Sequence, residues 1–125
     1  MNMELGALLG TWINSNPDTN SIARLEATDN NGQLELRIAA VGPDNGFIDW
    51  GVAEAQVFAA TTESNVGAGF TCRYDFGFAE TRLQGMIMKG LLVLAQFHLF
   101  KDDSKRASYF LREYYAATHE RFLEN

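Results

Sequence analysis

Two alternating runs joined by a tight turn constrain this chain more than any other feature. Residues 22–28 and residues 34–38 each alternate apolar with polar or charged side chains. A period of two predicts β-strands with one buried face, because successive side chains of a strand point to opposite sides. Between the runs stands Asn31-Gly32, a pair that favours the backbone of a two-residue hairpin turn. These residues therefore predict an antiparallel β-hairpin.

The rest of the chain continues this pattern of short strands and turns. Aromatic residues make up 12% of the chain, which favours sheet over helix. Eight antiparallel strands at hairpin spacing predict an all-β fold, either a closed up-and-down barrel or a sandwich. We favour the eight-stranded antiparallel up-and-down barrel, because closure removes edges that would otherwise template aggregation. The other predicted strands are residues 11–14, 48–60, 70–78, 82–88, 91–100 and 107–115.

Short helices are expected at the two ends of the chain. Residues 5–9 predict a short entry helix. The last strand has an alternative, because Asp103 or Ser104 could cap a helix in which apolar side chains recur at helical spacing. We prefer a strand to about Ala116, since the segment is rich in aromatic residues. A short helical tail over residues 118–123 would follow it.

Size, charge and cysteine content exclude several classes of protein. A chain of 125 residues predicts one domain over residues 1–125. Its net charge of −6 disfavours nucleic acid and anionic membrane surfaces as partners. The longest apolar region, residues 83–100, is interrupted by polar side chains and falls short of a membrane span. Cys72 is the only cysteine and the N-terminus does not resemble a signal peptide, so we expect a cytoplasmic protein.

Three residues carry a resemblance to a known family. Gly10 and Trp12 lie in the first predicted strand, and Arg112 lies in the last. In this the chain resembles the lipocalin-like, or calycin, superfamily of small β-barrels, which includes lipocalins, fatty-acid-binding proteins and avidins. The resemblance implies that Trp12 packs across one end of the barrel and that the Arg112 guanidinium stacks on its indole. Residues 10–14 are most similar to the opening strand of avidins, which implies a ligand contact for Asn14, although the later strands lack the tryptophans that wall the avidin site.

From these residues we expect non-catalytic binding of a small hydrophobic or aromatic ligand inside the barrel. A cavity and a barrel filled by its own side chains are both compatible with eight strands. For Arg112, the alternative to a ligand contact is a purely structural role. Two histidines and one cysteine offer few of the side chains that ligate zinc in conventional sites. No motif identifies a cofactor. The predicted apolar walls are Trp12, Tyr74, Phe76 and Tyr114, and the predicted polar contacts are Asn14, Gln96, His98 and Arg112.

Two other functions remain open. Residues 91–100 and 107–115 are apolar on both faces, whereas a solvated antiparallel strand is polar on its outer face. We therefore expect their outer faces to be covered, either by a second copy in a homodimer or by the C-terminal tail. A homodimeric interaction module with a filled barrel is the second function. The third is a lipocalin-like isomerase or lyase, in which His98 or Tyr114 would transfer a proton.

Overall fold

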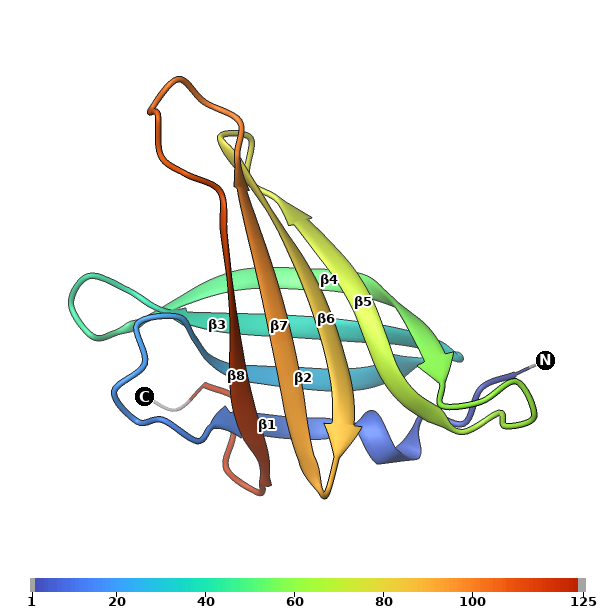
Figure 1. Ribbon diagram of the computed structural model, residues 1–125. Coiled ribbons are helices and arrows are strands. Elements are labelled where there is room, and N and C mark those ends of the chain that lie inside the picture. The colour runs from blue at the N-terminus through green and yellow to red at the C-terminus, as the bar shows by residue number, and fades with distance from the viewer. Residues whose placement is uncertain (1, 124–125) are drawn as a thin grey trace.

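A computed structural model describes residues 2–123, which form a closed barrel of eight antiparallel strands (Figure 1). Each strand pairs with the next in sequence, and β8 returns to pair with β1. The predicted all-β, up-and-down barrel is thereby confirmed. In chain order the elements are the 3-10 turn η1 (Gly6–Leu8), β1 (Gly10–Asn14), β2 (Ile22–Asn30), β3 (Gln33–Val41), β4 (Phe47–Ala59), β5 (Gly67–Asp75), β6 (Ala79–Met88), β7 (Leu91–Phe100) and β8 (Tyr109–Thr118).

Two-residue turns set the register of two hairpins. Asn31 and Gly32 have φ angles of 53° and 92°, both in the left-handed region that this turn requires. They join Asn30 to its partner Gln33 at the β2–β3 hairpin. Lys89-Gly90 makes the same kind of turn between β6 and β7, with φ angles of 52° and 78°. Because the side-chain period is two, these registers decide which residues face the barrel interior.

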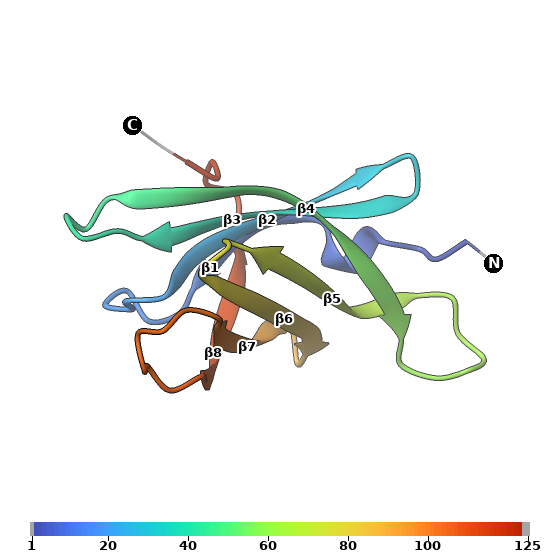
Figure 2. The ribbon, with the colours of Figure 1, turned by 90° about the horizontal axis from the view of Figure 1, so that it is seen from above.

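The hydrophobic core fills one end of the barrel. η1 packs beneath β5 and β1, and Trp12 donates a hydrogen bond from Nε1 to the carbonyl oxygen of Leu8 at 3.0 Å. Figure 2 shows the strands curving around the barrel interior, and inward side chains from β1 to β8 form one buried cluster with Leu8 of η1. The buried core includes Leu8, Trp12, Leu25, Leu34, Leu36, Phe70, Leu83, Leu92, Leu94 and Tyr115.

The C-terminal tail differs from its prediction. Residues 119–123 contain no helix. Phe122 instead packs, buried, against the outer face of β3, where the Arg37 guanidinium lies 5.1 Å from its ring centroid. Arg24 on β2 donates a hydrogen bond to the Arg121 carbonyl at 2.8 Å. The tail therefore covers β2 and β3 rather than β7 and β8, because two outward arginines and a buried aromatic ring hold it there.

Several other boundaries were only partly predicted, and β6, for example, begins at Ala79 and not at residue 82. β8 is a strand, as preferred, but it extends to Thr118 because it pairs with β1 as far as Thr11. β5 ends at Asp75, and Phe76 lies in a turn closed by a hydrogen bond from its N–H to the Ala79 carbonyl at 2.8 Å. Within residues 2–123, no helix has the length and apolar character needed to cross a membrane.

Candidate ligand site at the open end of the barrel

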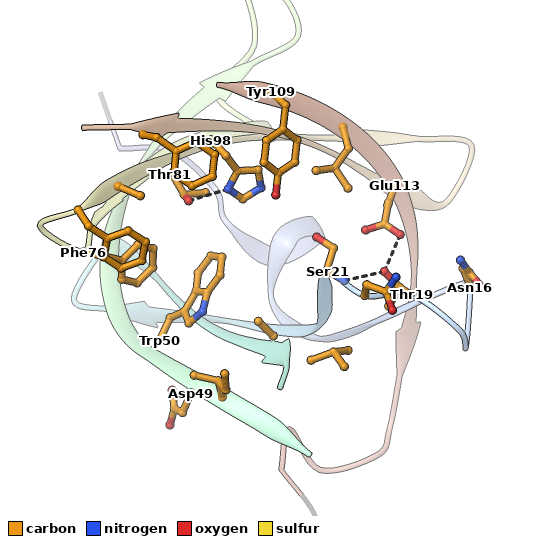
Figure 3. A pocket seen from close by; sticks show the side chains of 18 of the residues that line it. Asn16, Thr19, Ser21, Asp49, Trp50, Phe76, Thr81, His98, Tyr109 and Glu113 are labelled. Atoms are coloured by element: carbon orange, nitrogen blue, oxygen red, sulfur yellow. Dashed lines mark hydrogen bonds between the residues drawn. The ribbon is translucent and has the colours of Figure 1, made fainter. Parts of the chain in front are cut away.

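A cavity of about 920 Å³ opens at the end of the barrel away from η1 (Figure 3). Its lining comes from the β1–β2 loop, the adjoining ends of β3 and β4, the β5–β6 turn, and the paired ends of β6, β7 and β8. One wall is aromatic and the other carries most of the polar groups. The apolar lining residues are Ala40, Val41, Ile48, Trp50, Phe76, Phe78, Ala79, Phe100, Tyr109 and Leu111.

Trp50 forms the centre of the aromatic wall. Ile38 pairs with Gly51 and Ala39 pairs with Asp49, so Trp50 is the extra residue of a β-bulge in β4. A bulge redirects a side chain relative to regular alternation, and Figure 3 shows the Trp50 indole turned into the cavity. Its ring meets Phe76 edge-on, with centroids 5.0 Å apart.

Tyr74 supports this wall from the core side. Its ring lies 5.5 Å from Trp50 and 6.1 Å from Phe76, measured between centroids. The hydroxyl lies 3.1 Å from the Leu36 carbonyl oxygen and 2.9 Å from that of Gly51. Because burial raises the pKa of Tyr74 well above its ordinary value, the hydroxyl stays protonated and remains a donor to this bulged backbone.

His98 and Gln96 form a hydrogen-bonded floor on β7. His98 Nδ1 lies 2.9 Å from Thr81 Oγ1, and Nε2 lies 3.3 Å from Gln96 Oε1. Ser21 Oγ donates to the same Gln96 oxygen at 2.8 Å. Burial lowers the pKa of His98 below its ordinary value of 6.5, which keeps the ring neutral near pH 7. Both ring nitrogens are engaged, so neither is free to accept a proton from a ligand while these contacts hold.

Tyr109 and Glu113 complete the polar side of the cavity from β8. The Tyr109 ring stacks on His98 with centroids 4.8 Å apart. Glu113 Oε2 accepts a hydrogen bond from Thr19 Oγ1 at 2.8 Å, which ties β8 to the β1–β2 loop. Figure 3 shows the Tyr109 hydroxyl and the second Glu113 oxygen directed toward the middle of the opening. The site therefore combines ring faces with hydroxyl, imidazole and carboxylate groups.

Four of the predicted site residues lie in or directly behind this cavity. Phe76 and His98 line it. Tyr74 backs Trp50, and Gln96 is fully buried beneath His98, where no described residue accepts a hydrogen bond from its Nε2. The structure brings these residues together because β5, β6 and β7 are neighbours in the barrel.

Trp12 and Asn14 point inward but do not reach the cavity. Trp12 belongs to the filled end, beside η1. Asn14 is buried, and its side-chain amide forms hydrogen bonds with the backbone. Nδ2 donates to the Ile22 carbonyl at 3.1 Å, and Oδ1 accepts from the Asn16 N–H at 2.8 Å. This use of its amide replaces the ligand contact implied by the resemblance to avidins.

Arg112 and Tyr114 lie on the outer face of β8, contrary to expectation. Arg112 pairs with Ala95, whereas Trp12 pairs with Ala117 and is buried inside the barrel. Arg112 is exposed, so its guanidinium does not cover the indole and the predicted stacking is wrong. The inward residues of β8 are those that alternate with Arg112 and Tyr114, namely Tyr109, Leu111, Glu113 and Tyr115.

Several lining residues were missed from the sequence. Trp50 followed by Gly51 is a signal for a bulge, but the pattern alone does not say toward which face the tryptophan turns. Tyr109 and Glu113 share one side of the predicted last strand, so selecting that side would have found both. Thr19 and Ser21 lie in a loop, where periodicity carries no information.

Comparison with known proteins leaves the site to be judged on its geometry. No family model, curated protein or solved structure matches this chain. The closed eight-stranded antiparallel barrel is consistent with a lipocalin-like fold. Among residues 2–123, no group of three or more His, Cys, Asp or Glu is placed to hold a metal ion.

Proposed function

We propose that this protein is a calycin-like binding protein that holds a small hydrophobic or aromatic molecule, without catalysis, at the open end of its barrel. The observation that carries the proposal is the cavity of about 920 Å³ with an aromatic wall. Small-molecule sites are concave, largely apolar and supplied with a few polar groups that orient the ligand. Trp50 and Phe76 provide the apolar surface, and His98, Tyr109 and Glu113 provide the polar groups.

The packing of the two ends supports the same proposal. Trp12 and η1 close one end, where the core residues are fully buried. The wall at the other end is held in place before any ligand arrives, because Tyr74 and Gln96 fix Trp50 and His98 through buried contacts. A pre-organised wall lowers the ordering cost of binding.

A neutral fluorescent probe tests the proposal. N-phenyl-1-naphthylamine should bind the purified protein saturably, with one probe per chain. Leu111→Trp should weaken this binding by at least about tenfold, because the added rings occupy cavity volume at a position that lines it. The matched control is Phe110→Trp, one residue away on the outer face, which should bind like the wild type. Equal binding by the Leu111→Trp and wild-type proteins would reject the cavity as the site.

The outer face of β6, β7 and β8 favours a second function, assembly into a homodimer. We call the cluster of Met86, Met88, Val93, Phe97, Phe110 and Tyr114 the outer apolar face. The exposed fraction is 52% for Met86, 73% for Phe110 and 43% for Tyr114. Met86 pairs with Val93, which in turn pairs with Tyr114, and Phe97 pairs with Phe110 on the far side of the row that holds Ala95 and Arg112. Monomers rarely expose large contiguous apolar surface, and the C-terminal tail covers β2 and β3 instead.

Analytical ultracentrifugation tests this second function, because it measures whether the protein is a monomer or a dimer. The wild type should be a dimer at micromolar concentration, and Phe110→Asp should be a monomer with an unchanged circular dichroism spectrum, because it places a charge at the most exposed side chain of the apolar face. Phe47→Asp, which alters an exposed aromatic residue on β4, serves as the control and should remain dimeric. A monomeric wild type would exclude the dimer.

A further inference from the structure

Glu113 directs one of its two carboxylate oxygens toward the cavity (Figure 3). Thr19 holds Oε2 at 2.8 Å and so fixes the orientation of the group. Oε1 is buried, and no donor among residues 2–123 reaches it. In Figure 3 the second oxygen of Glu113 points away from Thr19 and toward the middle of the cavity. A buried acceptor without a donor is unfavourable, so a ligand that supplies a donor there gains more affinity than one that does not.

The charges around the cavity select a cationic donor. The acidic residues that line the cavity are Asp18, Asp49 and Glu113, and among the described residues neither lysine nor arginine lines it. Asp49 is paired with Arg37 on the outer face. His98 is neutral because burial lowers its pKa. An anionic ligand would therefore meet like charge from the lining residues, whereas a cation would be attracted, in agreement with the net charge of −6.

Aromatic side chains at the rim already hold a cation of this protein. Arg106, in the β7–β8 loop, lies 4.1 Å from the ring centroid of Phe100 and 5.8 Å from that of Phe78. Both rings also line the cavity. Figure 3 shows Trp50 and Tyr109 on two different walls of the opening, so a bound cation would be near further ring faces, which attract positive charge through their quadrupoles.

We propose that the ligand of this cavity is an amine, protonated at neutral pH, on a compact aromatic or apolar body. Its ammonium group donates to Glu113 Oε1, and its apolar body lies between Trp50 and Tyr109. Ser21 Oγ can accept a further ammonium hydrogen, because its own hydrogen is donated to Gln96 Oε1. This inference rests on the proposed function and adds the chemical class of the ligand.

Three molecules of one shape test the ligand class. 1-Naphthylmethylamine, 1-naphthylmethanol and 1-naphthoate carry a cation, a neutral hydroxyl and an anion on the same ring system. In calorimetric titrations of the wild type at pH 7, the amine should bind at least about tenfold more tightly than the alcohol, and the anion should bind most weakly. Equal affinity for the amine and the alcohol would overturn the inference while leaving cavity binding intact. Failure of all three molecules and of N-phenyl-1-naphthylamine would overturn the proposed function as well.

Variants assign the preference to Glu113. Glu113→Gln keeps the shape and the acceptor for Thr19 but removes the charge, so it should reduce amine affinity to that of the alcohol and weaken the alcohol much less than the amine. Asp18→Asn removes the same unit of charge from another lining residue and should retain the preference for the amine. Thr19→Val, which releases Glu113 Oε2, should cause a smaller loss for the amine alone. If Glu113→Gln weakens the amine and the alcohol equally, the carboxylate has a structural role and the inference is wrong.

Discussion

Trp12→Ala is expected to lower the free energy of unfolding by about 3–5 kcal/mol, the range for removal of a large buried aromatic side chain. Trp12 is only 5% exposed and packs in the core with Leu8 and Leu25. Its removal leaves a void at the closed end and takes away the donor for the Leu8 carbonyl. The loss should therefore combine a cavity term with an unsatisfied acceptor.

Urea unfolding followed by far-UV circular dichroism measures this loss without depending on tryptophan fluorescence. Trp12→Phe retains an aromatic ring but not the donor, and should lose only about 1–2 kcal/mol. Trp50→Ala is the matched control, because Trp50 is half-buried at the open end and should destabilise the protein less than Trp12→Ala. Equal stability of the Trp12→Ala and wild-type proteins would mean that the indole does not close the barrel.

Gly85→Val is expected to cost about 3 kcal/mol or more, through overpacking rather than a void. Gly85 pairs with Phe70 across β5 and β6, and the phenyl ring lies over the glycine. A Cβ added at Gly85 would collide with Phe70 Cζ and stand 2.6 Å from Cε2. The ring is 2% exposed and packed in the core, so it cannot move aside without disturbing its neighbours.

A double-mutant cycle identifies the cause of this loss. Phe70→Leu makes room for the valine, so the double variant Phe70→Leu, Gly85→Val should be destabilised by less than the sum of the two single variants. Gly46→Val is the control, because a Cβ at Gly46 meets no described atom within 4 Å, and it should unfold close to the wild-type midpoint. Additive losses in the cycle would show that the Phe70 ring does not cause the destabilisation.

Within the candidate site, the sequence predicted some residues and misplaced others for a definable reason. Alternation along residues 109–115 correctly separates odd from even positions. Both sets contain aromatic residues and one charged residue, Glu113 in one and Arg112 in the other. Hydropathy therefore does not distinguish the inner from the outer face of β8. The resemblance to calycins favoured Arg112 as the inward residue. In the structure Leu111 pairs with the inward Gln96, so Glu113, two residues further along the strand, also faces inward.

The sequence by itself determined the strands, the tight turns and the all-β class, because these depend on side-chain period and on backbone preferences of a few neighbouring residues. Asn31-Gly32 requires no distant contact to turn the chain. Only the tertiary structure decided which end of the barrel is filled, which way Trp50 turns at its bulge, and where the C-terminal tail lies. Each of these depends on contacts between strands that are far apart in the chain. The cavity has the same origin, since Thr19, Trp50, His98 and Glu113 meet only after β8 has closed against β1.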